Sequence, residues 1–253
     1  MPSWLLNKVP LVKKFIEIEA WARQRARARI SLGTQGKDGR SDFFSQLLSP
    51  PRQGDDPMTE EEILANALVL LNRNAYDVLS EEVRGRFQDE SDMDFRNCAT
   101  LPFLIACIQE SMRLYPAAPE IPPRVSPGDV IDGREVPAGT LITVFLTATN
   151  RSCRYFSEPD IFRPERWLPK THALYDAKFR HDDLSIVKPF SYGPRDCIGK
   201  SLRLHEMRLV VARLLFRFDF EMLPGQERWQ SGQRVFLLWE KPPLYVRFRP
   251  RGT

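Results

Sequence analysis

The spacing of apolar residues predicts a chain that is mainly helical. Apolar residues recur every three or four positions over residues 10–31, 59–87, 101–114 and 200–218, which is the spacing of one face of an α-helix. Thr59, with Glu62 three residues later, is typical of a helix N-terminus. The helix that begins there either continues to Phe87 or breaks near Asn72.

The pattern changes after residue 114. Prolines interrupt the chain in "YPAAPEIPPRV", and polar and apolar residues then alternate in "DVIDGREVPAGTLITVF". Alternation with Asp-Gly and Ala-Gly pairs predicts a small β hairpin or sheet. Two further short strands are predicted in the tail, "RVFLLWEKPPLYVRFRP". The predicted fold class is therefore mainly α with a minor β component.

Composition and charge exclude few functions. Hydrophobic residues make up 42% of the 253 residues, enough to form the core of one large domain or two small ones. The net charge of +4 gives no reason to expect a nucleic-acid partner. The basic end of the first predicted helix, "RQRARARI", is either a solvated face or a patch for a membrane surface or acidic partner. The first 15 residues lack the apolar run of a signal peptide or anchor, which predicts a cytoplasmic chain.

The cysteines and histidines form no metal-binding or disulfide pattern. The four cysteines are far apart in the sequence and make no C-x-x-C pair, so we expect neither a zinc site nor a disulfide partner. The three histidines occur in unrelated settings, and we expect all three at the surface: His172, His181 and His205.

Cys197 has the most specific setting, because it lies in "PFSYGPRDCIG" just before a predicted helix. Backbone N–H groups at a helix start favour a thiolate. Gly193 and Gly199 allow unusual backbone angles and the close approach of a flat group, and Phe190 can shield the sulfur. Arg195 offers a guanidinium to a carboxylate. Together these features fit a thiolate ligand of haem iron, with Arg195 on a haem propionate. The alternative is a buried structural cysteine.

The pattern F-x-x-G-x-R-x-C-x-G formed by these residues favours the haem site. It resembles the haem-binding signature of the cytochromes P-450, the haem-thiolate monooxygenases, at every fixed position. The resemblance implies that Cys197 is the axial ligand of the iron of haem b. It also implies that Arg124, in "IPPRV", binds a second propionate. The other interpretation of Arg124 is a surface arginine in a loop.

Two further motifs of the family follow in the family's order. "ESMR" supplies Glu110 and Arg113, and "FRPERW" supplies Arg166, with Trp167 where the family has Phe. The resemblance implies that Glu110, Arg113 and Arg166 form a buried network that holds the cysteine loop. "EEVR" has the same spacing, but it lies in a polar stretch and is expected to be a surface ion pair.

The resemblance also implies an activity and partners. A family member of the fungal, microsomal type inserts one atom of O2 into a small lipophilic substrate, here in secondary metabolism, at the endoplasmic reticulum membrane. Its electrons come from NADPH-cytochrome reductase, which docks over the cysteine loop. Basic residues that could meet an acidic partner, or be ordinary solvated charges, follow the cysteine on its helix: Lys200, Arg203 and Arg208.

The resemblance predicts an incomplete C-terminal part of the family's fold. Residues 1–58 match only loosely as helices, 59–100 match a truncated central helix and the helix after it, and 101–253 match the haem-proximal half. The acid-threonine pair that relays protons to oxygen is missing, because "NRNAYDVLSEEVR" follows Leu71 too early. We therefore expect an internal deletion. Two hypotheses remain: a monooxygenase, or a truncated and inactive haem-binding remnant. The ordered motifs argue against a third, a basic interaction module without haem.

Overall fold

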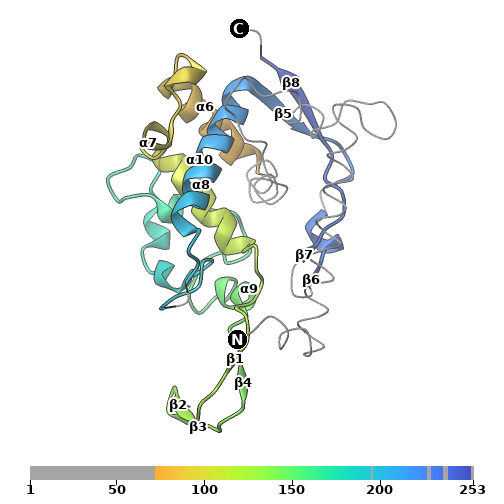
Figure 1. The fold of residues 1–253 in the computed structure, drawn as a ribbon. Helices are drawn as coiled ribbons and strands as arrows, with labels where there is room; N and C mark the ends of the chain where they lie inside the picture. The colour runs from red at the N-terminus through yellow and green to blue at the C-terminus, as the bar shows by residue number, and fades with distance from the viewer. Residues whose placement is uncertain (1–71, 195, 227–228, 236–238, 252–253) are drawn as a thin grey trace. The chain divides into compact units, whose positions relative to one another are not determined.

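The computed structural model describes residues 72–194, 196–226, 229–235 and 239–251 (Figure 1). All of them belong to one of the two units into which the chain divides, Glu61–Thr253. Three predictions fall outside the described residues: the amphipathic helix over residues 10–31 with its basic end, the helix from Thr59 to residue 71, and the role of Arg195.

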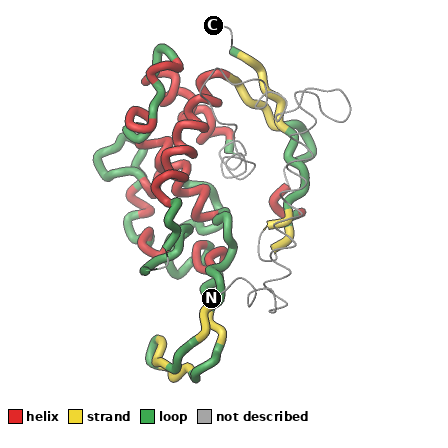
Figure 2. The backbone as a smooth tube through the Cα atoms, in the orientation of Figure 1, coloured by secondary structure: helices red, strands yellow, loops and turns green. Residues whose placement is uncertain are grey.

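The described residues are mainly helical with small antiparallel sheets, which confirms the predicted fold class (Figure 2). The α-helices are α6 (Arg73–Arg86), α7 (Phe95–Cys98), α8 (Pro102–Leu114), α9 (Leu146–Asn150) and α10 (Lys200–Arg217). Single 3-10 turns lie between them: η1 (Glu90–Asp92), η2 (Pro164–Trp167), η3 (Ala177–Phe179) and η4 (Leu184–Ile186). A further turn, η5 (Trp229–Gly232), follows α10.

Helix α6 begins directly after Asn72. The backbone of Asn72 is extended (φ −108°, ψ 99°), and its side chain accepts a hydrogen bond from the N–H of Ala75 (3.0 Å). An extended residue with this side-chain bond is an N-cap. Of the two alternatives for residues 59–87, the chain therefore adopts a break at Asn72.

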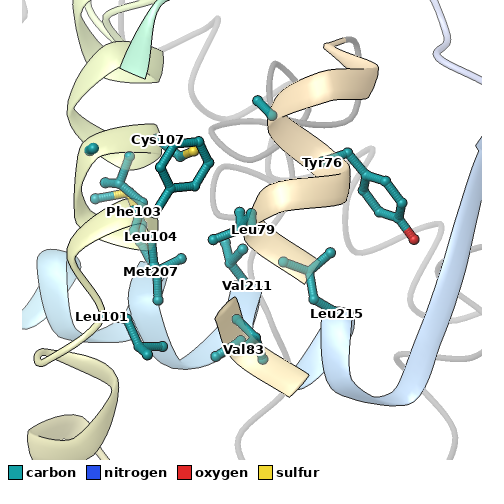
Figure 3. Packing of buried hydrophobic residues seen from close by; sticks show 14 of the residues in the cluster. Tyr76, Leu79, Val83, Leu101, Phe103, Leu104, Cys107, Met207, Val211 and Leu215 are labelled. Atoms are coloured by element: carbon teal, nitrogen blue, oxygen red, sulfur yellow. The ribbon is translucent and has the colours of Figure 1, made fainter. Parts of the chain in front are cut away.

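Helices α6, α8 and α10 build the core together. Apolar side chains of α6, α8 and α10 meet in one buried cluster (Figure 3). Its fully enclosed members include Leu79 and Val83 of α6, Leu104 of α8 and Leu215 of α10. Because α8 carries buried side chains on most of its surface, it is the central helix of this part of the chain.

A carboxylate from α6 caps the start of α8. The N-cap of α8, Leu101, makes no side-chain hydrogen bond, so the first N–H groups of the helix need other acceptors. Glu82 supplies them: its two carboxylate oxygens accept the N–H groups of Phe103 and Leu104, each at 2.8 Å. This contact fixes the direction in which α8 leaves its loop.

The strands form four two-stranded antiparallel sheets within the described residues. They pair as β1 (Arg124–Val125) with β4 (Leu141–Ile142), β2 (Asp129–Ile131) with β3 (Arg134–Val136), β5 (Phe218–Met222) with β8 (Val246–Pro250), and β6 (Arg234–Val235) with β7 (Trp239–Glu240). The predicted hairpin is confirmed, with Asp132 and Gly133 at its turn in the left-handed region (φ 51° and 74°).

The last predicted helix is one residue too long, and the strand after it was missed. Helix α10 ends at Arg217, and Phe218 is already extended and pairs with Pro250 at the end of β8. The pairing partner lies more than thirty residues away in the sequence. The helical period alone therefore gave no sign that "FDFEM" forms a strand.

Within the described residues, no helix combines the length and the apolar character that crossing a membrane requires.

Candidate functional site

Cys197 lies in a loop that backbone hydrogen bonds close just before α10. The N–H of Cys197 donates to the carbonyl of Phe190 (2.9 Å), and the N–H of Asp196 donates to the carbonyl of Gly193 (3.0 Å). The carbonyl of Cys197 in turn accepts the N–H of Lys200 (3.2 Å), the first residue of α10. Cys197 is thereby held just before the N-terminus of an 18-residue helix.

The two glycines of the loop have different roles. Gly193 lies in the left-handed region (φ 87°), as does Ser191 (φ 64°), so the turn before Cys197 needs the conformational freedom of glycine at Gly193. The expectation of unusual backbone angles was wrong for Gly199, whose φ of −82° is open to any residue. A Cβ on Gly199 would instead stand 3.8 Å from the sulfur of Cys197. The absence of that atom leaves this side of the sulfur uncovered.

Cys197 is exposed, so it is not a buried structural cysteine. All four cysteines are free thiols: Cys98 and Cys107 are buried, and Cys153 is exposed like Cys197. Burial raises the pKa of Cys98 to about 11 and the pKa of Cys107 well above that of an ordinary thiol. Both buried thiols are therefore inert packing residues, and the chemistry of an accessible sulfur is left to the other two.

Large apolar side chains beside Cys197 point into solvent. Ile198, the next residue, is fully exposed, and Leu202, one turn into α10, is 58% exposed. Tyr192, in the turn before the cysteine, is 80% exposed. Exposed apolar side chains close in sequence to an accessible thiol suit the binding of an apolar group. Phe190 is different, because it is half-buried and packs against the core.

These residues fit a haem. Among the described residues, no three His, Cys, Asp or Glu side chains are grouped as they are in a protein-built metal site. An exposed thiol can by itself bind a metal that brings its other ligands with it, as haem iron does. The apolar side chains of Ile198 and Leu202 offer the surface that a flat, apolar macrocycle would cover.

Glu110 and Arg113 form a fully buried pair on α8. The Nε and Nη2 atoms of Arg113 donate to the two carboxylate oxygens of Glu110, each at 2.8 Å, and neither side chain is exposed. The Nη1 atom of Arg113 also donates to the carbonyls of Asn150 and Pro159, each at 2.7 Å. The pair therefore ties α8 to the end of α9 and to the loop after it.

Arg166 and Trp167 of η2 add donors to the same carboxylate. The Nε atom of Arg166 donates to Glu110 at 3.2 Å, and the indole N–H of Trp167 donates at 2.8 Å. The backbone N–H of Arg163 donates at 2.9 Å. With the two bonds from Arg113, five donors surround one carboxylate, which is enough to satisfy a buried charge. The network thus includes Trp167, which the sequence showed only as a replacement for Phe.

A second carboxylate completes this network. Arg166 also pairs with Asp182, whose side chain is 2% exposed, and donates to the carbonyl of Ser157 at 3.0 Å. Burial lowers the pKa of Arg166, and the charge of Glu110 opposes that shift. Asp182 was not among the predicted residues. It lies in the polar run "RHDDL", where no periodicity distinguishes a buried acid from exposed ones.

The second Glu-x-x-Arg motif does not form the expected surface ion pair. Arg84 instead reaches the end of α10: its Nε donates to the carbonyl of Leu215 (2.9 Å), and its Nη2 donates to the carbonyl of Phe218 (3.0 Å) and to Asp219 (2.6 Å). The last carbonyls of a helix lack partners within it, and a guanidinium satisfies them. Arg84 therefore joins α6 to α10 rather than pairing with Glu81.

The remaining candidates lie apart from this network. Arg124 is half-buried in β1, where it pairs with Ile142 of β4. Of the basic residues on α10, Lys200 is exposed, Arg203 is half-buried and pairs with Glu206 (3.6 Å), and Arg208 is half-buried. Burial lowers the pKa of Arg208.

The histidines are less exposed than expected. His181 is at the surface, but His172 and His205 are half-buried. The ring of His205 packs edge-on against Phe95 (5.6 Å between centroids) and lies 2.6 Å from the carbonyl of Ser201. These contacts explain why a polar residue on an amphipathic helix is partly covered.

Comparison with known proteins gives a consistent result. Residues 64–248 match the model of the family described as Cytochrome P-450. The chain is 39% identical over 235 residues to the cytochrome P-450 monooxygenase dtxS2 of Metarhizium robertsii, covering 84% of the chain and 45% of that relative. It is 42% identical over 181 residues to cpaH and 34% identical over 265 residues to astJ, both cytochrome P-450 monooxygenases of Aspergillus oryzae. Those matches cover 71% and 96% of the chain, and 34% and 52% of the relatives. The chain thus spans about half, or less, of the length of these relatives.

Proposed function

Because this chain belongs to the cytochrome P-450 family, we propose that it binds haem b through Cys197 and forms the haem-proximal part of a fungal monooxygenase. The observation that carries this proposal is the exposed Cys197 thiol, held at the start of α10 beside a fully exposed isoleucine. The family implies a haem cofactor; the proposal adds that it is iron protoporphyrin IX and that this chain holds it.

Each residue of the loop has a proposed role toward the haem. When bound, haem supplies the iron at which dioxygen is activated, with electron donation from the thiolate. Cys197 would hold the iron through its sulfur. Gly193 shapes the turn, and Gly199 leaves the sulfur open on one side. Phe190 anchors the loop to the core, while Arg195 and Arg124 bind the propionates.

The arrangement along the chain supports a division into three parts. Residues 101–253 would be the haem-proximal half, residues 59–100 a shortened central helix with the helix that follows it, and residues 1–58 loosely matching helices. Support comes from the order of the motifs and from the buried network, because Glu110, Arg113 and Arg166 all belong to the first of these parts.

Partners and substrate are proposed by the same reasoning. Members of this family generally take electrons from redox partners, and we infer NADPH-cytochrome reductase as the donor here. The exposed Lys200 beside the loop suits an acidic docking surface. The substrate would be a small lipophilic compound of secondary metabolism, and the place of action the endoplasmic reticulum membrane. The reaction inserts one oxygen atom of O2 into that substrate.

A specific observation favours a second candidate, a haem-binding remnant without monooxygenase activity. The sequence has no acid-threonine pair of the kind that relays protons to oxygen in this family. The alignment with astJ is 265 residues long, whereas the chain has only 253 residues, so some positions of that relative have no counterpart here. This supports an internal deletion, and the early occurrence of "NRNAYDVLSEEVR" after Leu71 suggests a place before α6.

The absorption spectrum of the reduced chain under carbon monoxide tests the proposal. The purified chain should give the red-shifted Soret band of thiolate-ligated haem. Replacing Cys197 with Ser should abolish the shift, and replacing the other exposed cysteine, Cys153, should leave it unchanged. An unshifted band, or no bound haem, would refute the proposal. Product formation with NADPH and reductase then separates the active enzyme from the remnant.

A further inference from the structure

The described contacts of Glu110 and Arg113 do not include the cysteine loop, so any support that they give the loop has to pass through other residues. Glu110 and Arg113 contact residues between Asn150 and Trp167. Arg166 alone among the three predicted residues has a described contact with the segment that leads into the loop. Its guanidinium stacks on Phe179 (4.5 Å to the ring centroid) and pairs with Asp182.

Asp182 also balances the charge of the network. Glu110, Arg113 and Arg166 together carry one net positive charge, and none of the three side chains is exposed. A net charge without water is costly, and an opposite charge in contact offsets that cost. Asp182 is 2% exposed and supplies the second negative charge, so the four side chains together are neutral.

Hydrogen bonds also hold the segment around Asp182 against residues 155–157. One oxygen of Asp182 accepts the N–H of Ser157 (2.8 Å), whose carbonyl accepts Arg166 (3.0 Å). The next residue, Asp183, donates its N–H to the carbonyl of Tyr155 (2.9 Å). Two consecutive residues of one segment are therefore held against residues 155–157, which flank the network.

From this anchor a short, hydrogen-bonded path leads to the cysteine. The side chain of Asp183 caps η4 by accepting the N–H of Ser185 (3.1 Å). The chain then turns at Lys188, whose carbonyl accepts the N–H of Ser191 (2.9 Å). The carbonyl of Phe190 accepts the N–H of Cys197 (2.9 Å). Movement at Asp182 would therefore be transmitted to the backbone of the loop.

We propose that Asp182 is a positioning residue, the charge-balancing fourth member of the buried network and the link through which that network fixes the Cys197 loop. As a statement about haem ligation, this inference rests on the proposed function. As a statement about the order of the loop, it does not depend on haem.

The test compares Asp182→Asn with Asp219→Asn in the full chain. Both changes remove the charge of an aspartate that pairs with an arginine distant in the sequence, but Asp219 is 53% exposed. Hydrogen exchange, measured without haem, should be about tenfold faster at the Cys197 amide in Asp182→Asn. Exchange in α6 and α8 should accelerate less than exchange at the Cys197 amide. Asp182→Glu, which retains the charge, should restore part of the protection.

A spectrum supplies the second readout. In haem-loaded chain, Asp182→Asn should raise the unshifted carbon monoxide band at the expense of the red-shifted one, and Asp219→Asn should not. The proposal is wrong if the loop exchanges at the same rate in both variants, or if exchange accelerates equally in α6, α8 and the loop. A wild-type chain without the red-shifted band would contradict the proposed function, yet leave the exchange result to decide on Asp182.

Discussion

Arg113→Ala should unfold this part of the chain far more readily than any exposed arginine variant. The side chain of Arg113 is fully buried and donates twice to Glu110, once each to Asn150 and Pro159, and once to Ile161 (3.3 Å). Alanine removes all five bonds at once, along with the contact over the ring of Phe156 (5.0 Å).

The magnitude follows from what is left unpaired. Breaking a buried ion pair by deleting one partner costs about 3–5 kcal/mol, because the remaining charge stays buried. Glu110 keeps the bonds from Arg163, Arg166 and Trp167, which lowers the cost toward 3 kcal/mol. Of the three carbonyls that lose a donor, only that of Asn150 is in a fully buried bond, and it adds about 1 kcal/mol. We therefore expect a loss of about 4 kcal/mol, a large share of the roughly 5–15 kcal/mol that stabilises a typical domain.

Urea unfolding followed by circular dichroism measures this loss. With a slope of about 2 kcal/mol per molar urea, 4 kcal/mol lowers the midpoint by about 2 M. Arg247→Ala is the matched control, because Arg247 is 54% exposed and pairs with Glu221 at the surface (3.2 Å), where such pairs contribute roughly 0–1 kcal/mol. Haem content should fall with stability in Arg113→Ala. A loss below about 1 kcal/mol, or a stable variant with full haem content, would refute the network as described.

Three further predictions test single contacts. Trp167→Phe removes the indole donor to Glu110 together with part of the ring, so it should cost about 1–2 kcal/mol in urea unfolding, and a neutral result would contradict a contribution from this bond. Glu82→Ala removes the acceptors of Phe103 and Leu104 at the start of α8 and should cost about 1–2 kcal/mol, against no measurable change for Glu81→Ala on the polar side of the same helix. Thiol labelling at pH 8, without haem or denaturant, should modify Cys153 and Cys197 and spare Cys98 and Cys107, because burial raises the pKa of both buried thiols; labelling of all four would contradict the described core.

The sequence predicted those features whose cause is local in the chain. Helix α8 ends at Leu114 as predicted, because an apolar period and the prolines after it both act over a few residues. The turn before Cys197 was expected for the same reason, since Gly193 needs only its neighbours to specify its conformation. The strand β5 was missed because its partner β8 is distant in the sequence.

The members of the buried network could be predicted only in part, for the same physical reason. Glu110 and Arg113 share a helical spacing that a reader can see, but Asn150 reaches Arg113, and Asp182 reaches Arg166, only through the tertiary fold. Burial, not spacing, distinguishes Asp182 from Asp183 beside it, and that burial comes from the contacts of Asp182 with Arg166 and Ser157. The three motif residues together carry one net positive charge, and this is the one feature of the sequence that predicts a further buried acid.

The exposed cysteine loop depends on the buried network for its order. A loop that exposes a thiol and a whole isoleucine to solvent does not gain its order from burying those side chains. The loop is instead ordered by contacts with the protein interior: Phe190 packs against the core, and the segment before the loop is anchored at Asp182. A rigid support behind an uncovered apolar surface is what a binding site for a flat apolar group needs, because the group then finds the ligand already in place. A basic interaction module would need no such support, so this arrangement fits the proposed haem site better than a general docking surface.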